Sequence, residues 1–138
     1  MIRWLRALAV GVAVVTATGD ARAEFRDYVL DPGHTSIGFM VHHIGYADTL
    51  GLFTEVRGRF AYDESAPAVR DVYVEVDAAS IFSNNEARDQ HARNADFLDV
   101  EDHPTIVFEG TEATPTGART GTITGDLTLR GVTREVTF

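Results

Sequence analysis

The chain has 138 residues, no cysteine and a formal net charge of −9, and its 12 basic residues are all arginine. Without cysteine, disulfides, thiol catalysis and thiolate metal ligands are excluded, and without lysine so is Schiff-base chemistry. Nucleic acids and anionic membrane surfaces repel a chain this acidic, so neither is an expected partner.

The first segment, residues 1–23, has the organisation of a secretory signal peptide. Two arginines near the N-terminus precede an uncharged, mostly apolar run over residues 7–18, and Ala21 and Ala23 supply small residues at the cleavage positions. This run is too short to cross a hydrocarbon core of roughly 30 Å as a helix, so stable membrane insertion is not expected. We therefore predict cleavage after Ala23, a periplasmic or secreted location, and one mature domain over residues 24–138. The three arginines and one aspartate lost on cleavage would change the net charge from −9 to −11.

Beyond residue 24, apolar and polar residues alternate with the two-residue period of β-strands. In chain order, this pattern predicts seven strands, over residues 25–30, 34–44, 52–63, 69–77, 105–110, 121–130 and 134–138. Asp31-Pro32-Gly33 is a strong turn sequence, residues 45–51 are predicted as a glycine-flanked loop, and residues 114–117 as a hairpin turn. Gly58, inside the third strand, indicates a bulge or bend.

Residues 83–94 interrupt the alternation and predict a short helix. Ser83 and Glu86 have the spacing of a capping box, in which the two side chains bond free backbone amides of the first turn. Asp89 and Arg93, four residues apart, would add an ion pair along the helix. A helix of this length needs tertiary contacts to persist.

Seven mainly antiparallel strands and one short helix predict an all-β protein, either a sandwich or an up-and-down barrel. The last strand pattern, residues 134–138, runs to the end of the sequence, where an apolar edge strand would leave backbone groups unpaired. We therefore expect a C-terminal truncation with the closing strands missing, and such an edge also allows a homodimer.

Five sequence blocks resemble the YceI family, and the resemblance extends from about Tyr28 to Phe138. The blocks are His34–Phe39, His43–Tyr46, Gly58–Phe60, Arg88–Asp99 and Gly125–Thr133. This resemblance implies an exported, lipocalin-like, eight-stranded antiparallel barrel that binds polyisoprenoid lipids in a long apolar interior. The family usually continues beyond the position of Phe138, with further strands that close the barrel.

Alternating apolar residues on the inward face of the strands form the expected binding surface. Its members are Ile37, Phe39, Val41, Phe60, Val72, Val74, Val76, Ile106, Phe108, Leu127 and Leu129. Periodicity alone favours a solid core for them, because a small barrel can either pack itself solid or hold one ligand. Only the family resemblance favours a lipid-filled interior, in which each buried CH₂ would contribute roughly 0.8 kcal/mol.

Three polar residues are candidates for contact with a lipid head group. His43 ends the inward row of its strand, while Arg88 and His91 share one face of the predicted helix, where they could stabilise an anionic head such as a pyrophosphate. The alternative for this helix is an ion-pair network that fixes it to a strand and comprises Arg88, Asp89, Arg93 and Asp96.

The sequence therefore predicts a non-enzymatic, exported carrier or sequestering protein for an isoprenoid-type lipid, such as a prenyl phosphate or a quinone. We expect no metal or other cofactor, because His42 and His43 point to opposite faces of a strand and no histidine pair has metal-binding spacing. Two alternatives stay open. One is a small hydrolytic enzyme that uses His43 or His91 at the barrel mouth as base, and the other is a solid-cored interaction domain whose open edge pairs with another subunit.

Overall fold

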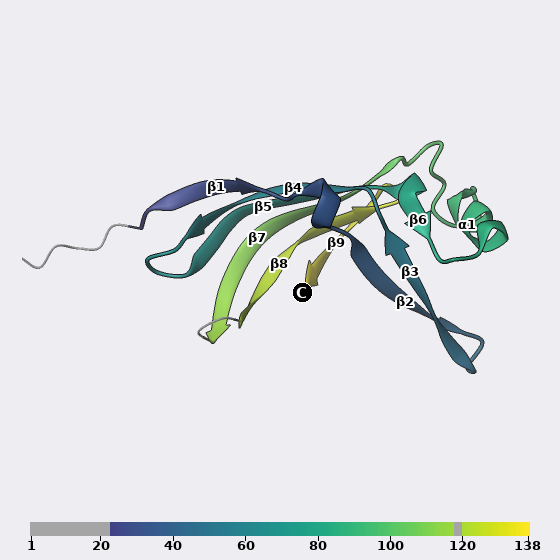
Figure 1. Ribbon diagram of the computed structural model, residues 1–138, viewed down its shortest axis with the longest axis horizontal. Coiled ribbons are helices and arrows are strands. Elements are labelled where there is room, and N and C mark those ends of the chain that lie inside the picture. Colours follow the sequence, from purple (N-terminus) through teal and green to yellow (C-terminus); the bar gives the residue numbers. More distant parts are fainter. Residues whose placement is uncertain (1–22, 118–119) are drawn as a thin grey trace, which may run out of the picture.

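The computed structural model describes residues 23–117 and 120–138 (Figure 1). The predicted signal peptide, except for Ala23, lies outside these described residues. Within them, the strands are β1 (Phe25–Val29), β2 (Ile37–His43), β3 (Ala47–Phe53), β4 (Val56–Asp63), β5 (Ala68–Asp77), β6 (Ile81–Phe82), β7 (Thr105–Gly117), β8 (Thr120–Leu129) and β9 (Val132–Thr137). The helices of the described part are the 3₁₀ turns η1 (Pro32–His34) and η2 (Ala78–Ser80) and the α-helix α1 (Glu86–Arg93), and none is long and apolar enough to span a membrane.

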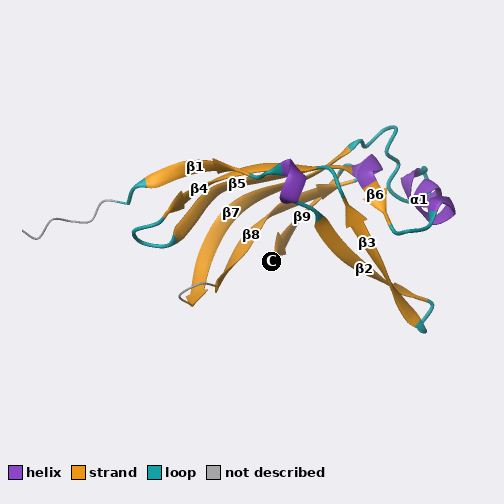
Figure 2. Cartoon of the chain, viewed as in Figure 1, coloured by secondary structure: helices purple, strands orange, loops and turns teal. Residues whose placement is uncertain are grey.

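The strands form two antiparallel sheets, which confirms the all-β prediction (Figure 2). The larger sheet has the strand order β1-β4-β5-β7-β8-β9, and the smaller has the order β2-β3-β6. The large sheet curves, the β2–β3 hairpin projects from it, and α1 lies at the end opposite the β4–β5 and β7–β8 turns (Figure 1). The described strands do not close into a barrel, because the two sheets share no hydrogen-bonded strand pair.

The predicted loop over residues 45–51 is wrong, because most of it forms β3. The chain reverses over residues 44–46, where Ile44 (φ 44°) and Gly45 (φ 80°) are left-handed and the amide of Tyr46 donates to the carbonyl of His43 at 3.1 Å. Two consecutive left-handed residues are typical of the tight type I′ turn, which lets antiparallel pairing resume at once. Isoleucine rarely adopts this conformation, so the turn could not be recognised from the residue types.

The predicted hairpin turn over residues 114–117 is also wrong. β7 continues through Pro115 to Gly117, and β8 pairs with it from Thr120 onward. Proline is tolerated there because β7 pairs with β5 only as far as Glu109, so the other edge of its later half needs no amide donor. The predicted third strand likewise divides into β3 and β4, and the described residues form nine strands where seven were predicted.

Gly58 is not itself a bulge. It pairs regularly with Val74, and the register shift lies further along, where Asp71 of β5 has a φ of 55°. Glycine fits this position because a Cβ there would lie 2.7 Å from Cδ1 of Leu30 and 2.8 Å from the carbonyl oxygen of Tyr73.

The short helix occurs where it was predicted, but its cap is different. Asn85, not Ser83, is the N-cap, and its side chain accepts a hydrogen bond from the amide of Arg88 at 3.0 Å. Arg93 donates to the carbonyls of Ala79 (2.8 Å) and Ile81 (2.9 Å), and its ion-pair partner on the helix is Glu86 (3.9 Å) instead of Asp89. These two bonds attach α1 to η2 and β6.

The tightest part of the core lies where β4 starts and β5 ends, next to η2. Its buried members are Val56, Val76, Ala78 and Ile106. Partly buried side chains pack around them, namely Leu30, Phe53, Val74, Val100 and Leu127. Phe53 belongs to the smaller sheet, so this cluster joins the two sheets.

Candidate functional site

The apolar residues predicted to face inward lie on one face of the large sheet. The pairing places Val74 opposite Phe108 and Phe108 opposite Leu127, and Val76 lies opposite Ile106. In an antiparallel sheet, such opposite residues share a face. We call this surface the apolar face, and it carries Phe60, Val72, Val74, Val76, Ile106, Phe108, Leu127 and Leu129 from the predicted set.

Further residues that the sequence did not place in the site extend the apolar face. Ile123 follows the same alternation on β8, and its backbone exchanges hydrogen bonds with Phe138 at 3.0 Å. The ring of Phe138 lies edge-on to that of Phe108 at 5.3 Å, and Val136 pairs with Gly125. The two-residue alternation of the sequence could have identified Ile123, because it lies four residues before Leu127 on the same strand and so faces the same side.

The four predicted residues of β2 share one face of the hairpin. The ring of Phe39 covers Gly51, lies 5.2 Å from that of Phe53, and so connects this face to the core cluster. Ile37 and Val41 are exposed, and His43 is exposed beside the turn. The hairpin therefore contributes apolar surface that the described residues only partly cover.

Arg88 and His91 lie at the far end of the molecule, on α1. Arg88 donates from Nε to the hydroxyl of Ser83 (2.7 Å) and from Nη2 to its carbonyl (2.6 Å). His91 packs edge-on against Phe97 at 4.8 Å and lies 3.6 Å from the carboxylate of Asp96. These contacts support the structural role that the sequence left open, and a head-group role for the pair stays a prediction.

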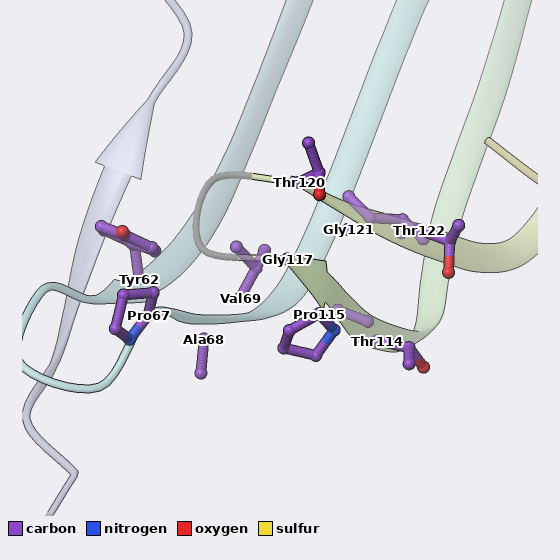
Figure 3. A pocket seen from close by; sticks show the side chains of 12 residues that line it. Tyr62, Pro67, Ala68, Val69, Thr114, Pro115, Gly117, Thr120, Gly121 and Thr122 are labelled. Atoms are coloured by element: carbon purple, nitrogen blue, oxygen red, sulfur yellow. The ribbon is translucent and has the colours of Figure 1, made fainter.

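Two clefts open on the side away from α1, where β5 and β7 separate. The larger, about 270 Å³, is lined by Tyr62, Pro67, Ala68, Val69, Ala113, Thr114, Pro115, Gly117, Thr120, Gly121, Thr122 and Ile123 (Figure 3). The smaller, about 140 Å³, also borders Arg70, Asp71 and Glu112. In the described part of the chain, no group of three histidine or carboxylate side chains is placed to hold a metal ion.

Two buried carboxylates hold chain turns in place. Asp63 accepts hydrogen bonds from the hydroxyl of Ser65 (2.7 Å), the amides of Ser65 (2.8 Å) and Ala66 (3.3 Å), and the amide of Glu24 (3.0 Å). Asp89 accepts from the hydroxyl and the amide of Ser83. The serine hydroxyl is in each case the main reason why the pKa of the carboxyl lies below its ordinary value, and burial opposes this only in part.

These lowered pKa values predict acid sensitivity. Because the folded pKa of Asp63 and of Asp89 lies below the unfolded value of about 3.9, their stabilisation is fully present above that pH and disappears as pH falls through the folded pKa. We expect the free energy of unfolding, measured with urea, to be flat from pH 7 to about pH 5 and to fall below about pH 4. The double variant Asp63→Asn, Asp89→Asn should show a smaller fall in the free energy of unfolding below about pH 4. The control Asp27→Asn, at an exposed position, should leave this fall unchanged. An unchanged slope in the double variant would assign the acid sensitivity to other groups.

A curved antiparallel sheet with one continuous apolar face is typical of lipocalin-like β-proteins. The chain belongs to the YceI family, because the model of the YceI-like domain matches residues 28–138. Its relatives include UPF0312 proteins of Azotobacter vinelandii, 42% identical, and Pseudomonas savastanoi pv. phaseolicola, 40% identical, each over 134 residues that cover 96% of this chain and 68% of the relative.

Solved structures show the same fold. The YCEI protein of Campylobacter jejuni superimposes with a TM-score of 0.65 at 26% identity, over 80% of this chain and 64% of that one. BcnA of Burkholderia cenocepacia superimposes with a TM-score of 0.64 at 20% identity, over 74% of this chain and 62% of BcnA. This likeness concerns the fold alone. The present chain thus spans less than two thirds of these solved proteins.

Proposed function

We propose that this protein binds an isoprenoid-type lipid along the apolar face and acts as an exported carrier or sequestering protein. The observation that carries the proposal is the continuity of this face over β4, β5, β7, β8 and β9. Some of its members remain exposed in the described structure, with Leu129 at 40% and Phe138 at 69%. An uncovered apolar surface of this extent is typical of a binding site. Export rests on the predicted signal peptide.

A branched hydrocarbon tail suits such a surface. Each CH₂ removed from water contributes roughly 0.8 kcal/mol, so a tail of several isoprene units can offset its own ordering cost without any specific polar contact. The hydrolytic alternative gains less support. His43 lies beside an exposed turn, and His91 lies on the exposed surface of α1 against Phe97 and Asp96.

The direct test is to purify the complete gene product from its exported fraction, extract it with organic solvent and identify the bound lipids by mass spectrometry. We expect a prenyl lipid in roughly stoichiometric amount. A protein that is empty after purification, and that takes up no prenyl lipid from mixed vesicles, would contradict the proposal.

A charge on the apolar face should weaken lipid binding. We expect Val72→Asp to lower the affinity for a prenyl lipid at least about tenfold, because a buried carboxylate against a hydrocarbon tail loses its hydration. Val72 is half-buried and lies outside the core cluster, so the variant should still fold. The matched control is Val107→Asp, since Val107 lies on the opposite face of β7 and pairs with Glu75 and Thr128. Equal binding by the two variants, with circular dichroism confirming that both fold, would argue against the apolar face as the site.

A further inference from the structure

The first residue after the predicted signal peptide lies against a buried carboxylate. The backbone nitrogen of Glu24 donates to Oδ2 of Asp63 at 3.0 Å, and Asp63 is only 1% exposed. Phe25, the next residue, starts β1 and pairs with Asp63, the last residue of β4. This contact therefore joins the beginning of the predicted mature chain to the end of the neighbouring strand.

The pairing of β1 with β4 fixes the position of this nitrogen. All five residues of β1 pair in unbroken register with β4. Beyond β4, Ser65 and Ala66 donate to Oδ1 of Asp63 and hold its carboxylate in the turn. Both partners of the contact are thus placed by residues on the C-terminal side of Ala23, so cleavage after Ala23 leaves them in position.

The carboxylate of Asp63 is a buried charge whose described hydrogen bonds come from uncharged groups. Its donors are one hydroxyl and three amides, and its lowered pKa keeps it ionised near neutral pH. Two arginines of the adjacent strands are engaged by other acids. Arg26 of β1 lies 3.3 Å from the carboxylate of Glu24, and Arg70 of β5 lies 3.2 Å from that of Asp71. Because a buried carboxylate without a nearby cation is costly, this site is suited to a positive charge.

The nitrogen of Glu24 can supply that charge once the signal peptide is removed. The three bonds of the turn all end on Oδ1 of Asp63, whereas Oδ2 accepts only the bond from Glu24 among the described residues. Hydrolysis of the peptide bond between Ala23 and Glu24 consumes one water and leaves a carboxylate on Ala23 and an ammonium on Glu24. The ammonium predominates at neutral pH because the ordinary pKa of an α-amine is about 8.

We propose that Asp63 binds the N-terminal ammonium of the processed chain, and that removal of the signal peptide thereby stabilises the fold. The ammonium keeps the contact with Oδ2 that the amide makes and adds a positive charge beside a buried negative one. Hydrogen bonds between charged groups are roughly twice as strong as those between neutral groups. The gain exists only in a chain that starts at Glu24. The proposal rests on the predicted cleavage site and is independent of lipid binding.

The first measurement is the N-terminus of the complete protein, purified from its exported fraction and identified by mass spectrometry of its N-terminal peptide. We expect Glu24 with a free amine. A protein that begins at any other residue, or that retains residues 1–23, would overturn the proposal.

Acetylation of the amine separates the effect of the charge from that of the hydrogen bond. An Nα-acetyl group leaves one N–H donor on Glu24 but removes its charge. The 138 residues contain no lysine, so none of their side chains competes for the acetylating reagent. We expect the processed protein, acetylated in urea and refolded, to have an unfolding equilibrium constant roughly tenfold larger at pH 6 than the protein with a free amine. Equal constants for the two forms would overturn the proposal.

A chain that begins at Ala23 is the positional control. Its ammonium lies one residue, or roughly 3.5 Å, further along the chain, and the nitrogen of Glu24 is again an amide. We expect this chain to unfold like the acetylated protein. A chain that begins at Ala23 and is as stable as the chain that begins at Glu24 would show that the position of the charge is unimportant, and would overturn the proposal.

A substitution of the carboxylate assigns the effect to Asp63. In Asp63→Asn, the free-amine and acetylated forms should have the same stability, because the amide side chain carries no charge. The difference between the two forms should persist in Asp27→Asn, at an exposed position of β1. A difference that persists in Asp63→Asn would place the ammonium against another group and overturn the proposal.

If Asp63→Asn fails to fold, the pH dependence of the unsubstituted protein decides. The carboxylate should raise the pKa of the ammonium in the folded chain above its unfolded value of about 8. The extra stability of the free-amine form is then fully present below about pH 8 and disappears as pH rises through the folded pKa. The other charged side chains of this region are the same in both forms and cancel in the comparison, namely Glu24, Arg26, Glu64, Arg70 and Asp71. A difference without this alkaline loss would overturn the proposal.

Discussion

Replacing Gly125 by alanine is expected to lower the free energy of unfolding by about 3 kcal/mol. Gly125 is buried in β8, where a Cβ would collide with the carbonyl oxygen of Glu109 and lie 2.7 Å from Cα of Gly110 and 2.8 Å from Cζ of Phe108. Two of these three atoms belong to the backbone of β7, so they cannot move away as a flexible side chain would. The β7–β8 pairing must open at the centre of the apolar face. Urea unfolding followed by circular dichroism measures the loss.

Gly38→Ala is the matched control for this substitution. Gly38 also lies in a strand, but a Cβ there would meet only Cδ2 of Leu52 at 3.5 Å, an ordinary van der Waals distance. Because alanine also restricts the unfolded chain, we expect Gly38→Ala to change the free energy of unfolding by less than about 1 kcal/mol. If Gly125→Ala lowers the free energy of unfolding as little as Gly38→Ala does, β7 can shift at little cost, and the close contact at Gly125 is unimportant.

Removing the carboxylate of Asp89 is expected to cost about 3 kcal/mol. Asp89 is 3% exposed and accepts two hydrogen bonds from Ser83, whose hydroxyl in turn accepts from Nε of Arg88. In Asp89→Ala, the amide of Ser83 loses its acceptor, and the segment before α1 loses its attachment to the helix. Equilibrium urea unfolding gives the total cost, and hydrogen exchange at the amide of Ser83 shows whether the loss is local.

Asp96→Ala serves as the comparison for Asp89→Ala. The carboxylate of Asp96 lies 3.6 Å from Nε2 of His91, and both side chains are exposed. Exposed ion pairs contribute little, so this variant should lose less than about 0.5 kcal/mol. A loss for Asp89→Ala as small as that for Asp96→Ala, without faster exchange at Ser83, would contradict the structural role of the buried carboxylate.

The apolar face was predictable because side chains alternate across a strand whatever its partners are. Val72, Val74 and Val76 are on one face of β5 by parity alone, and the pairing with β7 only brings Phe108 opposite Val74. The resemblance to the YceI family, carried mainly by the block from Arg88 to Asp99, is confirmed by the match over residues 28–138. The roles of individual residues in lipid binding remain predictions.

The wrong predictions of the helix cap and of the turn over residues 114–117 have a common cause. In both places the local sequence is compatible with two arrangements. Ser83 and Asn85 both precede the helix and both can cap it, and only the position of Asp89 decides that Ser83 is used elsewhere. Pro115 usually ends a strand, yet it is accommodated because β5 has already separated from β7. In each case a contact with another element of the fold selected one of two locally acceptable arrangements.

By itself, the sequence determined the strand character of residues 24–138, the site of their helix and the face of each strand that is apolar, because these depend on neighbours within a few residues. The tertiary structure decided where β5 and β7 separate, which carboxylates are buried, and that Tyr62 and Pro115 border one cleft. The separation of β5 from β7 and the shared cleft arise between segments far apart in the sequence, and they depend on bulges whose effect on the direction of a strand appears only when both strands are placed in the sheet.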